Sequence, residues 1–325
     1  MKVVFLPHPV VGSPWHDHIV NLLEARYDVH ILDHDCDLPS QFEDVRAVVD
    51  LGGNAEAEVL AAMAEANVEF IQAQTNGLDH VPLDEIRRHG FTLAHCPGYL
   101  SATALAQTAM MYMLILAGRF QQAQITFREG PYYTPAGYEL GGKILGIIGF
   151  GASGTELARR AQPFGMKIHA IDVRPIDKEI LEEIHPEFLG GPDAMDQVIA
   201  ESDFLSVHLH LTKKTRHIID ARRLDLMKPD ACLINVTRGP LVDEEALFER
   251  LLSGAIGSAG LDAFDVEPPD PNHPVFALPN VAVTPHTGGG TEDVSRRRAQ
   301  FALDNLDRFF AGEPLEAVVF TGSRS

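Results

Sequence analysis

The sequence is poor in cysteine, in positive charge and in long apolar runs, and each shortage excludes a class of protein. Its three cysteines, Cys36, Cys96 and Cys232, are scattered without C-x-x-C spacing. This excludes a disulfide scaffold and indicates buried free thiols in a reducing compartment. No apolar run reaches the roughly 20 residues that a membrane-spanning helix needs. We therefore expect a cytoplasmic protein without a membrane partner.

The charge balance argues against a nucleic-acid partner. The 26 Lys and Arg residues face 46 Asp and Glu residues, so the formal net charge is −20, whereas phosphate binding needs a basic surface. An anionic substrate would have to be held by a few local arginines or backbone N–H groups against this field. The His- and Asp-rich stretches "PWHDH" and "HILDHDCD" match no standard metal-ligand spacing, so we expect solvated loops and no metal there.

The hydrophobic pattern predicts an α/β protein with two domains. At 325 residues the chain is long enough for two buried cores. Short β-branched runs such as "KVVFLP" and "RAVVDLG" alternate with helical segments such as "EAEVLAAMAEA", and the alternation restarts at "KILGIIGF". Strands that alternate with helices indicate parallel sheets. A long helix that begins at Ser101 separates the two halves.

A glycine-rich turn lies near the middle of the chain, in "LGIIGFGASGTELARR". It follows a predicted strand and opens a predicted helix, which is the context of a dinucleotide-binding turn rather than of an ordinary tight turn. The glycines allow the tight turn, a close approach to a pyrophosphate and close helix–strand packing, and the helix N-terminus attracts the phosphates. The predicted cofactor contacts in this turn are Gly149, Phe150, Gly151, Ala152, Ser153 and Gly154.

An acid follows the glycine turn at the spacing expected for a ribose ligand. Asp172 ends the second predicted strand of this half, about 20 residues after the glycines. A carboxylate there repels a 2′-phosphate, which favours NAD over NADP. Arg174 follows two residues later and makes NADP less unfavourable. The alternative interpretation is a tight turn with a surface aspartate.

Three further side chains follow strands in the second half. Arg238 ends "ACLINVTRG", Glu267 lies in the loop after "SAGLDAF", and His286 follows "VAVTP" before three glycines. Ligands of open α/β sheets bind at the carboxyl ends of strands, so we expect these groups at the edge that carries the glycine turn. Taken one by one, each could be a solvated or structural residue.

Together these three groups suit hydride transfer to a 2-oxo acid. Histidine can donate a proton to the carbonyl oxygen near neutral pH. A neighbouring carboxylate fixes its tautomer and favours its protonated form. Arginine can bind the substrate carboxylate and polarise the carbonyl group. The cofactor itself carries the hydride.

At this point the sequence resembles the D-isomer-specific 2-hydroxyacid dehydrogenase family. The resemblance rests on "ELGGKILGIIGFGASG", "NVTRGPLVDEEAL", "GLDAFDVEPPDP" and "TPHTGGGT", in family order and over nearly the whole chain. It implies two doubly wound parallel-sheet domains, in which a Rossmann dinucleotide-binding domain (residues 101–288) is inserted into a flavodoxin-like substrate domain (residues 1–100 and 289–325).

The resemblance also implies residue roles. Arg238 becomes the substrate-binding arginine, Glu267 the carboxylate partner and His286 the acid/base. The loop "QTNGLDHV" would bind the substrate carboxylate through the backbone at Asn76 and Gly77. The alternative interpretation of the same residues is a simple turn closed by the Asn-Gly pair. Substrate selection is expected in the loops around residues 51–54, 75–77 and 96–100. The remaining cofactor contacts implied by the family are His208, Thr215, Val236, Thr237, Asp262 and Gly288.

The predicted function is therefore an NAD-dependent oxidoreductase of small D-2-hydroxy acids, with glyoxylate or hydroxypyruvate as substrates by family habit. A homodimer through residues 101–130 is implied by the resemblance. Two alternatives keep the same fold. One is an NAD(H)-sensing binding protein similar to a corepressor. The other is a dehydrogenase of a different small anion, and Glu267 argues against formate because formate enzymes pair the histidine with glutamine.

Overall fold

The chain, described here by a computed structural model over residues 1–53 and 55–322, divides into two compact units. Unit 1 comprises Met1–Leu100 and Thr291–Ser325, and unit 2 comprises Ser101–Gly290. The chain thus begins unit 1, forms the whole of unit 2 and returns. The return falls at Gly290–Thr291, two residues later than the sequence suggested. The two-domain α/β prediction is confirmed.

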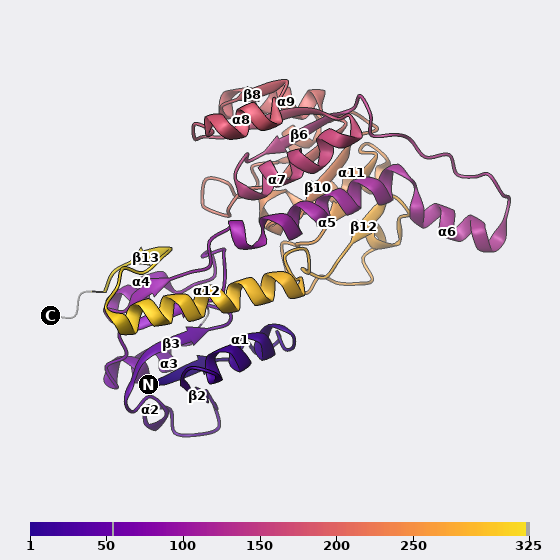
Figure 1. The fold of residues 1–325 in the computed structure, drawn as a ribbon. Helices are drawn as coiled ribbons and strands as arrows, with labels where there is room; N and C mark the ends of the chain where they lie inside the picture. Colours follow the sequence, from indigo (N-terminus) through magenta and orange to yellow (C-terminus); the bar gives the residue numbers. More distant parts are fainter. Residues whose placement is uncertain (54, 323–325) are drawn as a thin grey trace. The chain divides into compact units, whose positions relative to one another are not determined.

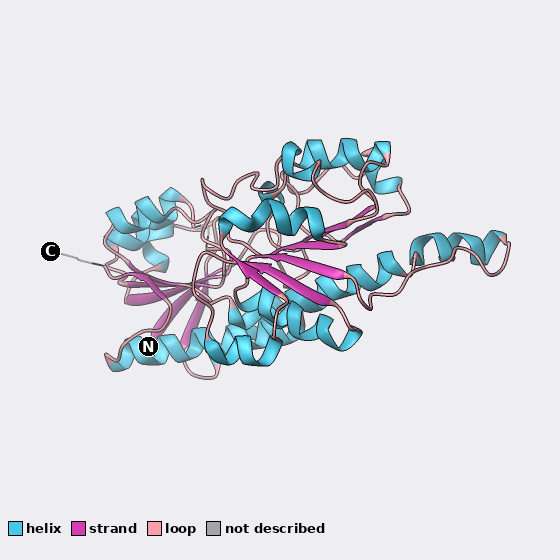
Figure 2. Cartoon of the chain, turned by 90° about the horizontal axis from the view of Figure 1, so that it is seen from above, coloured by secondary structure: helices cyan, strands magenta, loops and turns pink. Residues whose placement is uncertain are grey.

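Unit 1 is a six-stranded sheet with helices on both faces (Figures 1 and 2). The strand order is β13-β5-β4-β3-β1-β2, parallel except for β13, which pairs antiparallel with β5. The strands are β1 (Lys2–Leu6), β2 (Asp28–Ile31), β3 (Val45–Asp50), β4 (Phe70–Ala73), β5 (Thr92–Ala94) and β13 (Val318–Phe320). The helices are α1 (Trp15–Glu24), α2 (Leu38–Gln41), α3 (Ala57–Glu65), α4 (Leu83–Arg88) and α12 (Glu292–Ala311).

The return helix α12 completes the core of unit 1. Thr291 caps its first turn by accepting a hydrogen bond from the Val294 N–H (3.2 Å), and Gly312 ends it at φ +71°. Its apolar face, with Ala302 and Leu306, packs beside α1 on β1 and β3. Burial of this stripe explains why residues far apart in the sequence form one unit.

Unit 2 is a seven-stranded parallel sheet in the order β12-β11-β10-β9-β6-β7-β8. The strands are β6 (Ile144–Ile148), β7 (Lys167–Ile171), β8 (Phe188–Gly190), β9 (Phe204–Val207), β10 (Cys232–Asn235), β11 (Ser258–Leu261) and β12 (Val281–Val283). The helices are α5 (Tyr99–Ala117), α6 (Phe120–Glu129), α7 (Ala152–Ala161), α8 (Lys178–Ile184), α9 (Met195–Glu201), α10 (Ala221–Leu224) and α11 (Glu244–Ser253). Because β6 and β9 are central, the order reverses beside the glycine turn, where such sheets bind ligands.

Helix α5 corrects two expectations. It begins at Tyr99, before Ser101. By length and apolar composition alone its 19 residues could cross a membrane, contrary to the expectation from the sequence. However, 61% of its apolar window is buried inside the structure, and Met113 and Leu116 belong to the core of unit 2. A buried core helix passes the same length test.

The cysteines correct a third expectation. Cys96 and Cys232 are buried, but Cys36 is exposed, and all three are free. Burial raises the pKa of the Cys96 and Cys232 thiols to about 12, so both remain protonated and unreactive.

Candidate active site

Six strands of unit 2 end at one edge of the sheet, and the predicted site residues follow them. The glycine turn follows β6, Asp172 follows β7, and His208 follows β9. Arg238 lies in the loop after β10, Glu267 in the loop after β11 and His286 in the loop after β12. All of these strands are parallel, so their carboxyl ends bring groups from Gly149 to His286 to a common edge.

Two glycines of the turn, Gly149 and Gly154, are packed too tightly for a side chain to replace their hydrogens. Gly149 adopts φ +101°, and a Cβ there would lie 2.5 Å from the His208 carbonyl oxygen. A Cβ at Gly154 would lie 2.2 Å from the Gly149 carbonyl oxygen. Gly151 is the N-cap of α7, which has no side-chain cap. The first N–H groups and the positive end of this ten-residue helix therefore suit a phosphate.

Asp172 and Arg174 form an ion pair beside this turn. The Asp172 carboxylate accepts hydrogen bonds from the Arg174 N–H (2.9 Å), Nε (3.1 Å) and Nη2 (3.2 Å). Burial alone would raise the pKa of Asp172, but the Arg174 hydrogen bonds and the Phe150 N–H bring it below its ordinary value. Asp172 is therefore ionised at neutral pH and can accept hydrogen bonds from a ribose.

His208, which follows the neighbouring strand β9, contacts the first turn of α7. Its ring contacts the hydroxyl groups of Ser153 (3.0 Å) and Ser206 (2.9 Å). Burial lowers the pKa of His208 to about 4, so the imidazole is neutral at pH 7. Since Ser153 lies in the first turn of α7, this ring positions the helix end that the phosphates would meet.

A pH-dependent loss of stability follows from this buried ring. The pKa of His208 falls from 6.5 unfolded to about 4 folded, so the unfolded chain binds the extra proton and stability decreases as pH falls through this window. We expect wild type to lose about 2 kcal/mol more than His208→Gln between pH 7 and pH 5. Urea unfolding of both proteins at the two pH values measures this. Equal losses would mean that His208 is not buried in its neutral form.

Glu267 and His286, which the sequence predicts as carboxylate partner and acid/base, are in contact. The His286 Nδ1 lies 2.7 Å from Glu267 Oε2, and Glu267 Oε1 accepts a hydrogen bond from the Phe264 N–H (2.9 Å). Burial alone would raise the pKa of Glu267, but the contacts with His286 and Phe264 and the charge of Arg238 hold it below its ordinary value. The two side chains remain 37% and 43% exposed. Nε2 of His286 is therefore the ring nitrogen left for a substrate.

Arg238 lies close to this pair. It precedes Gly239, where a Cβ would lie 1.9 Å from the Phe264 carbonyl carbon. Only glycine allows this approach of the loop after β10 to the loop that carries Glu267. Arg238 itself is partly buried and donates to the Thr237 carbonyl oxygen (3.0 Å). Its charge is close enough to lower the pKa of Glu267.

Three further predicted cofactor contacts, Thr215, Val236 and Thr237, lie after β9 and β10. Thr237 stabilises its own loop through its Oγ1, which bonds Asn235 Oδ1 (3.1 Å), and Val236 is buried beside it. Thr215 is partly buried and donates from its hydroxyl to the His210 carbonyl oxygen (2.7 Å). Their contact with a cofactor stays a prediction.

Asp262 is placed more deeply than its predicted cofactor role suggested. The residue is completely buried. Its carboxylate accepts hydrogen bonds from the Thr287 N–H (2.8 Å) and the Gly288 N–H (2.7 Å). These bonds hold the loop on which His286 lies. Thr284, which donates to the same carboxylate (2.5 Å), was not identified from the sequence, because a threonine before "PH" carries no catalytic signal.

The predicted substrate loop of unit 1 follows β4. Thr75 donates from its Oγ1 to the Gly77 carbonyl oxygen (3.0 Å), and His95 Nδ1 contacts the Asn76 carbonyl oxygen (3.2 Å). A Cβ at Gly98 would meet the Asn76 side chain at 3.4 Å. The loop is therefore held by its own Thr75 hydroxyl and, from outside, by the ring of His95. In the neighbouring loop, Asn54 lies outside the described residues.

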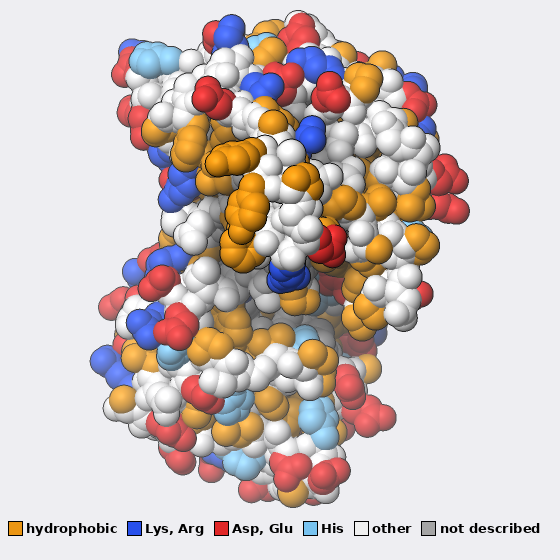
Figure 3. Space-filling view, turned by 90° about the vertical axis from the view of Figure 1, so that its right-hand side faces the viewer, with side chains coloured by type: hydrophobic (Ala, Val, Ile, Leu, Met, Phe, Trp, Pro, Cys, Tyr) orange, Lys and Arg blue, Asp and Glu red, His pale blue; other side chains and the backbone are white. Residues whose placement is uncertain are grey.

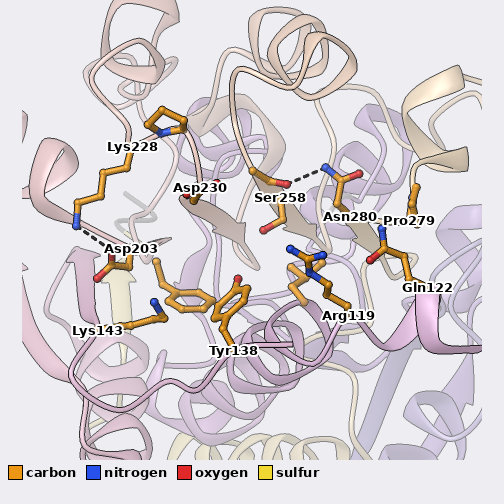
Figure 4. A pocket seen from close by; sticks show the side chains of 14 residues that line it. Arg119, Gln122, Tyr138, Lys143, Asp203, Lys228, Asp230, Ser258, Pro279 and Asn280 are labelled. Carbon is orange, nitrogen blue, oxygen red and sulfur yellow. Dashed lines mark hydrogen bonds and ion pairs between the residues drawn. The ribbon is translucent and has the colours of Figure 1, made fainter. Parts of the chain in front are cut away.

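A cavity of about 620 Å³ lies at the other edge of the unit 2 sheet (Figure 4). Its lining includes residues before or at the amino ends of strands, among them Lys143, Asp203 and Ser258. Asp203 pairs with Lys228 (2.8 Å) across part of it. It is therefore separate from the predicted chemistry. Within residues 1–53 and 55–322, no group of three His, Cys, Asp or Glu side chains could hold a metal ion.

Fold and site together define a dinucleotide-dependent α/β oxidoreductase, and comparisons with known proteins assign its family. Residues 110–288 match the D-isomer specific 2-hydroxyacid dehydrogenase, NAD binding domain. The chain is 35% identical over 293 residues to a hydroxypyruvate reductase of Thermotoga maritima, covering 88% of this chain and 93% of that protein. It is 39% identical over 255 residues to a glyoxylate reductase of Thermococcus litoralis, covering 76% and 75%.

A solved structure supports the same family. The 2-hydroxyacid dehydrogenase from Ketogulonicigenium vulgare Y25 superposes with a TM-score of 0.83 at 30% identity, over 99% of both chains. The chain therefore belongs to the D-isomer specific 2-hydroxyacid dehydrogenase family. It is an NAD-dependent oxidoreductase with a Rossmann domain, which confirms the predicted family, enzyme class and cofactor.

The residues at the sheet edge fit NAD. The glycines leave no side chain between the turn and a pyrophosphate, and α7 presents an uncapped N-terminus. Asp172 is ionised and only 6% exposed. The N-terminus of α7 is therefore suited to a dinucleotide phosphate, and the Asp172 carboxylate to a ribose.

Proposed function

We propose that this protein reduces a small 2-oxo acid to the D-2-hydroxy acid, with NADH as the reductant. The observation that carries the proposal is the His286–Glu267 contact of 2.7 Å at the sheet edge that holds the glycine turn. An imidazole oriented by a carboxylate is a proton donor for a carbonyl oxygen. Arg238, whose charge acts on the same Glu267, supplies a cation for the substrate carboxylate in a chain with a net charge of −20.

In this mechanism His286 donates the proton from Nε2 to the C2 oxygen of the substrate. Glu267 holds Nδ1 as an N–H and stabilises the imidazolium before transfer. Arg238 binds the substrate carboxylate and withdraws electron density from the carbonyl group. In the reverse direction His286 accepts the proton from the C2 hydroxyl group. The two directions use the same three side chains.

The cofactor would be held by the glycine turn from Gly149 to Gly154 and by Asp172. When bound, its nicotinamide supplies hydride chemistry at C2 of the substrate. His208, Thr215, Val236, Thr237 and Gly288 complete the proposed contacts. Asp262, predicted as a contact from the sequence, is completely buried and would support them through its bonds to the Thr287 and Gly288 N–H groups.

The proposed substrate contact in unit 1 is the backbone at Asn76 and Gly77, and these N–H groups would bind the carboxylate. Relatives named as hydroxypyruvate and glyoxylate reductases support a substrate with two or three carbons. We propose glyoxylate and hydroxypyruvate as the first candidates.

The test is NADH oxidation with a panel of glyoxylate, hydroxypyruvate, pyruvate and bulkier 2-oxo acids. Turnover of a member of the panel, with a typical kcat of about 1–1000 per second, supports the proposal. Absence of turnover with NADH and NADPH, together with tight NADH binding, would favour an NAD(H)-sensing protein instead. Turnover of formate or phosphite alone would indicate a dehydrogenase of a different small anion.

Cofactor preference gives a separate prediction. In Asp172→Ala the carboxylate that repels a 2′-phosphate is gone and Arg174 is released from its ion pair. We expect the ratio of kcat/KM for NADPH over NADH to rise about a hundredfold, because like-charge juxtaposition costs several kcal/mol. Arg174→Ala is the matched control and should not increase this ratio. An unchanged ratio in Asp172→Ala would contradict the assignment of Asp172 to the ribose.

We also propose a homodimer through α5 and α6. Apolar side chains there lie in solvent, and on the side where α6 lies Figure 3 shows such side chains gathered. The exposed residues of the two helices are Met111, Leu114, Phe120, Ile125 and Phe127, and the exposed Tyr132 and Tyr133 follow α6. None of the α6 residues is buried, so a second copy offers the simplest cover. Light scattering should give twice the chain mass of 35.6 kDa.

The proposed location is the cytoplasm, without nucleic acid or membrane as a partner. The free thiols and the net charge of −20 support this placement.

A further inference from the structure

Helix α5 reaches the loop that carries His286 at two points, one helical turn apart. Thr108 donates from its Oγ1 to the Gly288 carbonyl oxygen (3.2 Å). Tyr112 donates from its hydroxyl to the Leu261 carbonyl oxygen (3.0 Å) and also contacts Thr284 Oγ1. Residues four apart lie on the same helix face. One face of α5 therefore touches both ends of the segment Thr284–Gly288, which contains His286.

The Tyr112 hydroxyl starts a chain of hydrogen bonds beneath this loop. The Thr284 hydroxyl donates its proton to Asp262 Oδ1 (2.5 Å), so the single hydroxyl proton of Tyr112 is shared between Thr284 Oγ1 and the Leu261 carbonyl oxygen in a bifurcated hydrogen bond. The Asp262 carboxylate then accepts from the N–H groups of Thr287 and Gly288. Burial raises the pKa of Tyr112 above its ordinary value, which keeps its hydroxyl protonated. Every link is buried or partly buried and directional.

The loop needs such support because its backbone is strained. His286 adopts φ +54°, a left-handed conformation that is costly for a residue with a side chain. Its N–H donates to the Asp262 carbonyl oxygen (2.9 Å). The strained conformation persists only when its surroundings fix it.

Tyr112 packs closely against the sheet of unit 2. Tyr112 is almost completely buried, and a Cβ at Gly260 of β11 would lie 2.6 Å from the Tyr112 Cβ. Glycine at this position lets the helix approach closely enough for the hydroxyl to reach the strand ends. The ring packs against β11, while the hydroxyl bonds to groups that lead to His286.

We propose that Thr108 and Tyr112 form a clamp that holds the His286 loop in its reactive conformation, with Tyr112 as a positioning residue that acts through Thr284 and Asp262. The inference rests on the proposed function, because it assigns His286 the proton transfer. It adds two α5 residues: Thr108 bonds the backbone of Gly288, a proposed cofactor contact, whereas Tyr112 bonds Leu261 and Thr284, neither of which is a predicted substrate or cofactor contact. Geometry that is off by a fraction of an ångström lowers the rate of proton transfer without changing binding.

The test compares Tyr112→Phe with a matched control, Tyr27→Phe. Both variants lose a buried tyrosine hydroxyl that bonds a partner, since the Tyr27 hydroxyl donates to Asp307 (2.5 Å) in unit 1. Both keep the ring, so each should fold with a similar loss of thermal stability. We expect kcat to fall about tenfold in Tyr112→Phe and to stay at the wild-type value in Tyr27→Phe. The Kd of NADH and the KM of the 2-oxo acid should change less than about twofold in both.

Thr284→Val and Thr284→Ser test the link itself. Valine keeps the shape but removes the hydroxyl, and we expect a loss of kcat at least as large as that of Tyr112→Phe. Serine restores the hydroxyl and should recover most of the rate. Loss of kcat in Thr284→Ser as large as in Thr284→Val would overturn the hydrogen-bonded chain.

A readout without turnover separates this inference from the proposed function. The imidazole Cε1–H signal of His286, assigned by its disappearance in His286→Ala, should broaden or split in Tyr112→Phe in ¹³C-histidine-labelled protein. It should be unchanged in Tyr27→Phe. If wild type turns over none of the panel acids, the proposed function fails and this signal still decides the clamp. An unchanged His286 signal in Tyr112→Phe would overturn it.

Discussion

Replacing His286 with alanine is expected to lower kcat for 2-oxo acid reduction by about a thousandfold, within the 10²–10⁴ range of general acid catalysis. The side chain removed is the one whose Nδ1 lies 2.7 Å from Glu267. Its loss leaves the substrate oxygen without a proton donor. NADH binding should be preserved, because the glycine turn and Asp172 are untouched. Stopped-flow measurement of NADH oxidation under saturating substrate reports the change.

His34→Ala is the matched control, since His34 is an exposed histidine of unit 1. Its kcat should equal that of wild type. Glu267→Gln should give an intermediate loss, because the amide still accepts or donates a hydrogen bond but no longer stabilises the imidazolium. If His286→Ala retains the wild-type rate, another group donates the proton and the proposed mechanism is wrong.

Replacing Arg238 with glutamine is expected to lower kcat/KM for the 2-oxo acid by about a thousandfold. Truncation of one member of a buried, hydrogen-bonded charge pair costs several kcal/mol, and here the pair forms between Arg238 and the substrate carboxylate. Arg238→Lys keeps the charge but loses the planar fork, so we expect a loss of about 10- to 100-fold. The dependence of the initial rate on substrate concentration gives these ratios.

Arg216→Gln is the matched control for this experiment. Arg216 is an exposed arginine of unit 2 that pairs with Asp265 (3.3 Å) in the loop that also carries Glu267. Removing it changes the local charge equally and should leave kcat/KM within about twofold, as expected for an exposed ion pair. Equal losses in Arg216→Gln and Arg238→Gln would show that net charge, rather than a bound carboxylate, determines the effect.

The fold could be predicted from the sequence because its strands are buried and parallel. Apolar runs such as "KILGIIGF" correspond to β6, and the long helical stretches correspond to α5 and α12. The three-residue strands β8 and β13 were missed, although the equally short β12 was predicted from "VAVTP". The antiparallel pairing of β13 with β5 depends on tertiary contacts of unit 1.

The site could be predicted where chemistry is local to a strand end. Arg238, Glu267 and His286 each follow a strand, so the parallel topology dictates that they lie at one edge. The support beneath them could not be predicted. Tyr112 and Thr108 lie in an apolar helix, and nothing in their spacing indicates that their hydroxyl groups bond to residues 149 and 180 positions later.

Transfer of deuterium from NADH carrying deuterium at both C4 positions to hydroxypyruvate tests the central proposal most directly. Mass spectrometry and chiral chromatography of the product from wild type should find glycerate with deuterium at C2 and the D configuration. The same reaction with His286→Ala should yield about a thousandfold less product in the same time. Unlabelled glycerate, the L enantiomer, or equal yields from the two proteins would contradict a D-2-hydroxyacid dehydrogenase with His286 as its acid.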